Sequence, residues 1–305
     1  MARTRYAPDR GLTSRMLVTM FLLGLVYVVF VTAFFVIAPR WGLVALVAAV
    51  AFLLAQYFFS DRMALFAMRG RVVSPEEAPE LHGVVDRICA MSDAPKPRVA
   101  IADTDVPNAF ATGRNQRRAV VCVTTGLLRR LDPVELEGVL AHEMAHVAHR
   151  DVAVMTIASF LGVCAGLITR FGLEWGLWGG FRQRNGDQNT GLVLLAVVAV
   201  SALAYAVSFL LTRALSRYRE LSADRAAALL TGRPSALAGA LTKISGEMAR
   251  IPSRDLRAAE PFNAFFFAPA FTKGFSVSAL FSTHPSLERR LTQLQSISAQ
   301  LSKGA

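Results

Sequence analysis

Charged residues are scarce in this sequence of 305 residues: aspartate, glutamate, lysine and arginine together make up 18% of it. In ordinary soluble domains, charged residues make up about a quarter of the sequence. Hydrophobic residues make up 53% of the chain, and its mean hydropathy is +0.41. This balance argues against a protein that lies entirely in water, so we expect part of the chain to lie in lipid.

Acidic residues and cysteines are also few. There are 22 aspartates and glutamates against 33 lysines and arginines, which leaves a net charge of +11. Basic residues that flank membrane spans and face anionic lipid account for this excess, and the sequence contains no nucleic-acid-binding module. Cys89, Cys122 and Cys164 lack Cys-x-x-Cys spacing, which indicates buried thiols on a reducing side rather than a disulfide framework.

Charge is absent from four apolar runs, which are Met16 to Ala38, Trp41 to Phe59, Val152 to Thr169 and Gly191 to Leu211. The first two are each long enough to cross a hydrocarbon core of roughly 30 Å as a helix. The first run is too long for a cleaved signal peptide. For the last two runs, a hydrophobic hairpin buried in a globular domain is the alternative. We expect about four transmembrane helices.

The basic residues around the first two runs predict their orientation. Four arginines precede the first run and three follow the second, whereas the turn between them carries only Arg40. Basic residues favour the cytoplasmic side, so this bias places the N-terminus and the segment after Phe59 in the cytoplasm. We expect the catalytic domain and the C-terminus to be cytoplasmic as well. The predicted location is a cell inner membrane with several passes. Arginines in the loop from Arg170 to Asn189 weaken the rule for the second hairpin.

The most informative stretch is His142-Glu143-Met144-Ala145-His146. Histidines four positions apart lie on one face of a helix, one turn apart, so both imidazoles can reach one Zn²⁺ ion. Glu143 points beside that face, where it can take a proton from the water that the metal activates. The pattern is typical of zinc hydrolases, although a motif of five residues also occurs by chance.

The residues around the motif predict the helix that it needs. Asp132 can cap the helix, Pro133 suits its first position, and Glu135 lies three positions after the cap. The helix is therefore expected to reach His142 well before its end. We expect it to continue through Asp151 into the third apolar run.

A catalytic zinc ion needs a third protein ligand, for which His149 and Glu220 compete. His149 follows His142 by seven positions, a rise of about 10.5 Å along a helix, which is too far for one ion to bind both. Glu220 lies in a helical segment after the fourth apolar run and shares a face with Asp224. We expect Glu220 to bind the metal and Asp224 to accept the outer N–H of a histidine ligand. The alternative is that both carboxylates pair with nearby arginines on an exposed helix.

A small sheet is expected before the motif helix. Arg98 to Ala102, Asn108 to Gly113 and Ala119 to Val123 are predicted strands, and together they suggest an antiparallel sheet. Such a sheet can bind an extended peptide at its edge. Near the end of the chain, His284 precedes a proline at a helix entrance. Its imidazole either donates to an oxyanion or simply caps the helix, and the spacing does not decide between these roles.

These motifs together resemble the HtpX-type membrane zinc metallopeptidases, relatives of the CAAX prenyl proteases. The resemblance covers nearly the whole chain, and its order and spacing are more specific than any one motif. It is carried by the N-terminal hairpin, Asn108-Ala109-Phe110-Ala111-Thr112-Gly113, the His-Glu-x-x-His motif, Glu220-x-x-x-Asp224 and Thr283-His284-Pro285 with Arg290.

The resemblance implies a residue set for each role. It implies that His142, His146 and Glu220 bind one zinc ion, that Glu143 is the general base and that Asp224 supports a ligand histidine. It also implies that His284 and Arg290 hold the transition state or the substrate, and that Asn108, Ala109, Phe110 and Ala111 form the peptide-binding edge. The implied substrates are unfolded or damaged membrane proteins, degraded from the cytoplasmic side in a stress response.

We therefore expect an α+β integral membrane protein with a mainly helical, zincin-like catalytic domain. The predicted division is a transmembrane hairpin at 1–60, a first catalytic part at 61–150, a second hairpin at 151–212 and a second catalytic part at 213–305. A dedicated processing protease and a non-enzymatic membrane scaffold are the alternatives. The retained Glu143 argues against the scaffold, because zinc binding alone does not need that carboxylate. The sequence assigns neither an oligomeric state nor a role to the phenylalanine-rich stretch from Glu260 to Phe281.

Overall fold

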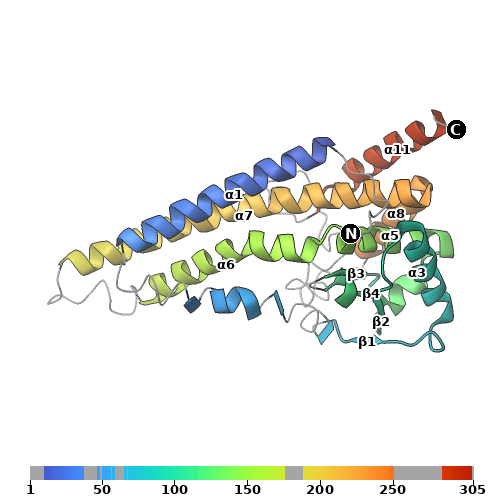
Figure 1. Cartoon of the computed structure of the whole chain (residues 1–305), viewed down its shortest axis with the longest axis horizontal. Coiled ribbons are helices and arrows are strands. Elements are labelled where there is room, and N and C mark those ends of the chain that lie inside the picture. Colours follow the sequence, from blue (N-terminus) through green and yellow to red (C-terminus); the bar gives the residue numbers. More distant parts are fainter. Residues whose placement is uncertain are drawn as a thin grey trace. The chain divides into compact units, whose positions relative to one another are not determined.

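The computed structural model describes residues 10–37, 68–113, 115–175, 188–250 and 284–303, with short pieces between 47 and 66. It forms two compact units. Unit 1 comprises Met1–Ser14, Phe58–Ala153 and Ser216–Ala305, and unit 2 comprises Arg15–Tyr57 and Val154–Leu215. The elements in Figure 1 are α1 (Arg10–Ile37), β1 (Gly70–Val72), α3 (Pro79–Ser92), β2 (Arg98–Ala102), β3 (Ala109–Thr112), η1 (Gln116–Arg118), β4 (Val120–Thr124), α4 (Thr125–Leu128), α5 (Pro133–Ala148), α6 (Asp151–Trp175), α7 (Gln188–Thr231), α8 (Pro234–Arg250) and α11 (Leu287–Lys303).

Three helices within the described residues are long and apolar enough to cross a membrane. These candidate spans are Thr13–Ala33 in α1, Asp151–Glu174 in α6 and Gly191–Thr231 in α7. They cover the first, third and fourth predicted runs. The second predicted run, Trp41 to Phe59, is described only in short pieces from residue 47 onward, so the expectation of four spans is not confirmed. The stretch from Glu260 to Phe281 also lies outside them.

The three candidate spans pack together in unit 2 through small and large apolar side chains. One buried cluster joins Phe30 of α1 to Leu161 and Ala165 of α6 and Ala204 of α7. The Tyr27 hydroxyl donates to the Ile157 carbonyl at 2.5 Å and accepts from the Leu161 N–H at 2.8 Å. Many large apolar side chains of these helices are exposed, which suits helices that face lipid.

The sheet of unit 1 is mixed, with strand order β1-β2-β4-β3. β1 pairs antiparallel with β2, β2 pairs parallel with β4, and β3 pairs antiparallel with β4. The expectation of a purely antiparallel sheet is therefore wrong. Strands that follow one another in sequence usually pair as hairpins, but here β4 lies between β2 and β3. This order leaves β3 at the edge of the sheet.

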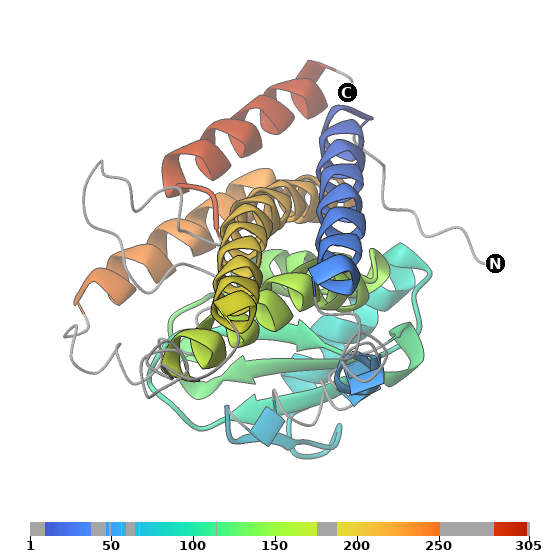
Figure 2. The ribbon, with the colours of Figure 1, turned by 90° about the vertical axis from the view of Figure 1, so that its left-hand side faces the viewer.

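Alternation along the strands sends side chains to two cores. Val99, Val121 and Val123 face a large core that also contains residues of α3, α5, α8 and α11. The intervening residues, such as Phe110 and Cys122, form a smaller cluster on the other face. The strands, α5, α8 and α11 can be followed in Figure 2. α5 thus lies against β3 and β4, between the sheet and α8.

The motif helix α5 begins as the sequence predicts but ends earlier. The Asp132 side chain accepts from the N–H groups of Val134 and Glu135, and Glu135 completes the capping box. α5 ends at Ala148 with His149 as its C-cap, and Arg150 has a left-handed φ of 57°. α6 begins only at Asp151. The expected continuous helix is therefore wrong, because the chain turns at residues 149–150.

Two glycines of unit 1, Gly126 and Gly83, test how closely the elements of this unit pack. A Cβ atom at Gly126 in α4 would lie 2.2 Å from the backbone carbonyl oxygen of Asp105, whereas at Gly83 in α3 nothing lies within 4 Å. We expect Gly126→Ala to lower the free energy of unfolding in mild detergent by about 1–3 kcal/mol, because a backbone must move. Gly83→Ala should raise it by about 0.5–1 kcal/mol. Equal stability of the two variants would contradict the close approach.

Candidate functional site

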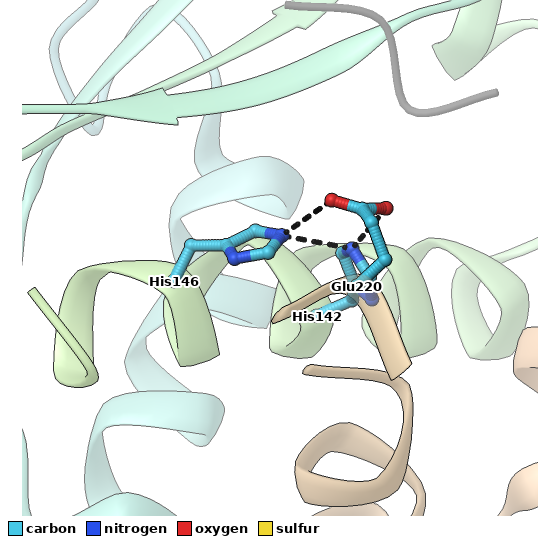
Figure 3. Close-up of side chains that lie close together, drawn as sticks. All are labelled: His142, His146 and Glu220. Carbon is cyan, nitrogen blue, oxygen red and sulfur yellow. Dashed lines mark hydrogen bonds and ion pairs between the residues drawn. The ribbon is translucent and has the colours of Figure 1, made fainter. Parts of the chain in front are cut away.

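Three side chains that can hold a metal ion converge in unit 1. They are His142 and His146 of α5 and Glu220 of α7, and their ligand atoms all lie within 4.8 Å of one another. Figure 3 shows both imidazoles and the carboxylate pointing toward one another. The four-residue spacing places the two histidines on one face of α5, and the long helix α7 brings the glutamate to them. The three residues that the sequence predicted therefore lie side by side, and we call them the metal-ligand group.

The separations of the ligand atoms suit tetrahedral zinc. His142 Nε2 lies 3.1 Å from His146 Nε2 and 3.7 Å from Glu220 Oε2, and His146 Nε2 lies 3.3 Å from Glu220 Oε1. With metal–ligand bonds of about 2.0–2.2 Å, tetrahedral geometry separates the ligand atoms by about 3.4 Å. The three observed distances bracket that value.

The outer nitrogens of both histidines face carboxylates. His142 Nδ1 lies 2.9 Å from Asp224 Oδ1, and His146 Nδ1 forms a short hydrogen bond with Asp151 Oδ2. Because an ionised carboxylate only accepts, each Nδ1 carries the proton and each Nε2 presents a lone pair. Two lone pairs and a carboxylate oxygen that face one another repel unless a cation lies between them. The donor set therefore fits a divalent metal ion.

Asp224 is in turn held by Arg290 of α11. The guanidinium donates to both carboxylate oxygens, from Nε at 2.7 Å and from Nη2 at 2.6 Å. Arg290 is 1% exposed and Asp224 is fully buried. Arg290 Nη1 also lies 3.8 Å from Glu220 Oε2. From the sequence we expect Asp224 beside a ligand histidine; in the structure Asp224 lies beside His142, with Arg290 on its other side.

His284 also reaches the metal-ligand group. Its Nδ1 lies 3.0 Å from Glu220 Oε2, and the side chain is 6% exposed. The Ser286 hydroxyl accepts from the Arg289 N–H at 3.3 Å, so Ser286 caps α11. The sequence left His284 open between an oxyanion donor and a helix cap. The capping role belongs to Ser286.

The Glu143 side chain reaches from α5 to the edge strand β3. Its Oε2 accepts a hydrogen bond of 2.9 Å from the Ala111 N–H of β3. Burial raises the pKa of Glu143 to about 7, and a nearby divalent cation would favour the ionised form. The carboxylate is thus fixed beside the metal-ligand group without being one of its three members.

Only some backbone N–H and carbonyl groups of the edge strand β3 point away from the sheet. Asn108 pairs with Thr124 through both its N–H and its carbonyl, and the Phe110 side chain is buried beneath the sheet. By the alternation of an antiparallel pair, Ala109 and Ala111 direct their N–H and carbonyl groups away from β4. The Ala111 hydrogen bond to Glu143 agrees with this alternation.

Two charged residues of the site escaped the sequence analysis. Asp151 contacts His146, and its other oxygen forms a short ion pair with Nη2 of Arg219. Their only sequence signal is weak: an acidic residue at the start of an apolar run, and an arginine beside the predicted ligand Glu220. His149, which the sequence set aside, is the C-cap of α5, and burial lowers its pKa to about 4.

Comparison with known proteins gives consistent matches. The model of peptidase family M48 matches residues 75–298. "Protease HtpX homolog 1" of Streptomyces coelicolor is 64% identical over 98% of this chain and 97% of the relative. "Protease HtpX homolog" of Moorella thermoacetica is 52% identical over 98% of each chain. "Protease HtpX homolog 2" of Methanosarcina mazei is 51% identical over 98% of this chain and 100% of the relative.

A solved structure shares the fold. The crystal structure of S. mikatae Ste24p has a TM-score of 0.51 and 18% sequence identity, covering 94% of this chain. The chain spans 66% of the length of that protein. At this identity the likeness concerns the fold alone.

Removal of the Arg290 guanidinium tests the pairing behind the metal-ligand group. Arg290→Met leaves the Asp224 carboxylate buried without its charged partner, so we expect the free energy of unfolding to fall by about 3–5 kcal/mol. The matched control is Arg71→Met, which breaks an exposed pair with Glu77 and should cost less than about 1 kcal/mol. Denaturant titration in mild detergent measures both. Similar losses in the two variants would contradict the buried pairing.

Proposed function

The chain belongs to peptidase family M48 as a membrane metallopeptidase of the HtpX type, and from this premise we propose that His142, His146 and Glu220 bind one catalytic zinc ion. The carrying observation is the convergence of two imidazole lone pairs and one carboxylate at separations of 3.1–3.7 Å. When bound, zinc supplies Lewis-acid chemistry: it polarises an amide carbonyl and makes water more acidic.

Glu143 is the proposed general base. The carboxylate lies next to the metal-ligand group and is held by the Ala111 N–H at 2.9 Å. It takes a proton from the attacking water and then gives that proton to the leaving amine, which ends the hydrolysis of the peptide bond. The proton is therefore carried by a side chain that does not bind the metal.

The edge strand β3 is the proposed peptide-binding edge, within the segment Asn108, Ala109, Phe110 and Ala111. The outward N–H and carbonyl of Ala109 and the outward carbonyl of Ala111 suit an added strand. Because Ala111 also donates to Glu143, a peptide on this edge would lie beside the general base. Asn108 and Phe110 contribute by shaping the strand, since the backbone of the first and the side chain of the second face inward.

His284 and Arg290 take different roles in this proposal. His284 Nδ1 lies 3.0 Å from Oε2 of the proposed ligand Glu220, and this nearness supports a role for its imidazole in stabilising the oxyanion that develops on the substrate. Arg290 is buried against Asp224 and acts through it by fixing the orientation of His142. This proposed role of Arg290 replaces the one that the resemblance implied, which was to hold the transition state or the substrate.

The proposed setting is a multi-pass membrane protein whose catalytic part and both termini are cytoplasmic. The arginine bias around the first two apolar runs supports it. The proposed division is membrane hairpins at 1–60 and 151–212 with catalytic parts at 61–150 and 213–305, in line with the extents of units 1 and 2. The proposed substrates are unfolded or damaged membrane proteins, because the site adjoins apolar spans along the chain.

Glu143→Gln tests the mechanism. We expect it to retain zinc and to lower the rate of casein cleavage by at least about 10²-fold, the usual loss when a general base is removed. The matched control is Glu137→Gln, which changes the same residue type on the same helix, where Glu137 pairs with Arg87; its rate should stay within about twofold. Full activity of Glu143→Gln would refute Glu143 as the base.

The same assay, run on sealed membrane vesicles, tests the orientation of the protein in the membrane and the range of its substrates. Inside-out vesicles expose the cytoplasmic face and should cleave added casein, whereas right-side-out vesicles should not. Cleavage of several unrelated unfolded proteins supports quality control. Cleavage of one protein alone would favour the dedicated processing protease.

Backbone methylation of a peptide substrate tests the edge strand. In a strand added to β3, every second amide pairs with the edge and the others point away. We therefore expect methylation at alternate amide nitrogens to raise KM by about tenfold, the equivalent of one lost hydrogen bond. Methylation at the intervening positions should change KM little. A KM that is insensitive to position would argue against strand addition.

A further inference from the structure

Asp151 is a buried carboxylate that joins the two helices of the metal-ligand group. It is 7% exposed, with Oδ2 in a short hydrogen bond to His146 Nδ1 and Oδ1 in a short ion pair with Arg219 Nη2. His146 belongs to α5 and Arg219 to α7. Arg219 is 3% exposed and immediately precedes the ligand Glu220. One carboxylate thus contacts a predicted zinc histidine and the neighbour of the predicted zinc glutamate.

The contact depends on the turn between α5 and α6. In a continuous helix, residue 151 would lie about 7.5 Å further along the axis than residue 146 and about 140° around it, which is out of reach of the His146 ring. The chain instead turns at His149 and Arg150, and Arg150 has a φ of 57°. A non-glycine residue in this conformation is uncommon and persists where surrounding structure requires it. Here the turn returns Asp151 to His146.

The arrangement repeats the one behind His142. His142 has Asp224 at its Nδ1, and Arg290 pairs with that carboxylate. His146 has Asp151 at its Nδ1, and Arg219 pairs with that carboxylate. In both cases a buried arginine compensates the buried charge of the carboxylate that holds the imidazole. The two histidines are therefore supported in the same way from different elements.

We infer that Asp151 is a positioning residue for the metal site, holding the His146 ring with Nε2 toward the metal, and that Arg219 holds Asp151 in place. This inference rests on the proposed metal site formed by His142, His146 and Glu220. Because Asp151 is the first residue of α6, a candidate membrane span, the start of that span is part of the support of a zinc ligand. A displacement of Asp151 would change the orientation of His146.

Zinc affinity tests the inference directly. Full-length protein in detergent is stripped of metal and titrated with Zn²⁺ against a competing chelator. We expect Asp151→Ala to raise the Kd for zinc by about 10–100-fold, the usual range for partners of ligand histidines. Asp151→Asn should raise it less, because the amide oxygen still accepts the Nδ1 proton.

Arg219 gives a second pair of variants. Arg219→Gln removes the charge behind Asp151 and should raise the Kd for zinc by about tenfold. Arg219→Lys keeps a charged donor for the single contact with Oδ1 and should restore the Kd to within about threefold of the wild type. This rescue would not follow if Arg219 served stability alone.

Glu135→Gln is the matched control for general damage to the helix. Glu135 is also a buried carboxylate at a helix start, paired with Lys243 at 2.6 Å, but it does not contact the metal-ligand group. It should lower the melting temperature while the Kd for zinc stays within about twofold. If Asp151→Ala and Arg219→Gln behave like this control, the inference is overturned.

Three further outcomes are decided by the same titration. If Asp151→Ala does not fold, the comparison of Arg219→Gln with Arg219→Lys decides by the same criterion. If the wild-type protein binds no zinc, or binds it equally well after His142→Ala, the proposed metal site itself fails. Wild-type zinc binding that is lost in His142→Ala but kept in Asp151→Ala would overturn the positioning role alone.

Discussion

Convergence of electron pairs at one point is the constraint on which the rest of the structure depends. His142 and His146 present Nε2 lone pairs toward each other at 3.1 Å, with the Glu220 carboxylate facing both. Each ring can do so in only one tautomer, which a carboxylate at Nδ1 selects. The group needs a cation between its members, so the geometry and the assignment to a metallopeptidase family have the same physical basis.

The surrounding charges hold this group in place. A buried charge costs several kcal/mol unless it is paired, and Asp224 and Asp151 are each paired with a buried arginine. The Ala111 N–H fixes Glu143 to the edge strand. The proposed ligands and base are therefore each held by a partner from another element.

The site also adjoins the candidate spans along the chain. Asp151 begins α6, and Glu220 lies in α7, which starts at Gln188 and continues without a break. Both helices contain a candidate membrane span. The proposed ligands therefore lie, along the chain, within a few helical turns of the apolar spans. Asp151 and Glu220 are part of the same helices as the candidate spans, so the chain itself keeps them close to these spans.

Local spacing by itself determined the capped helix of the motif, the shared face of His142 and His146, and the shared face of Glu220 and Asp224. These follow from helix periodicity and capping chemistry, which act over a few residues. Only the tertiary structure decided that β4 lies between β2 and β3, that Arg290 pairs with Asp224, and that Asp151 returns to His146. The sequence led us to expect a continuous helix there. The turn at Arg150 instead brings Asp151 to His146 and Arg219, and these contacts join residues from different elements that no local pattern relates.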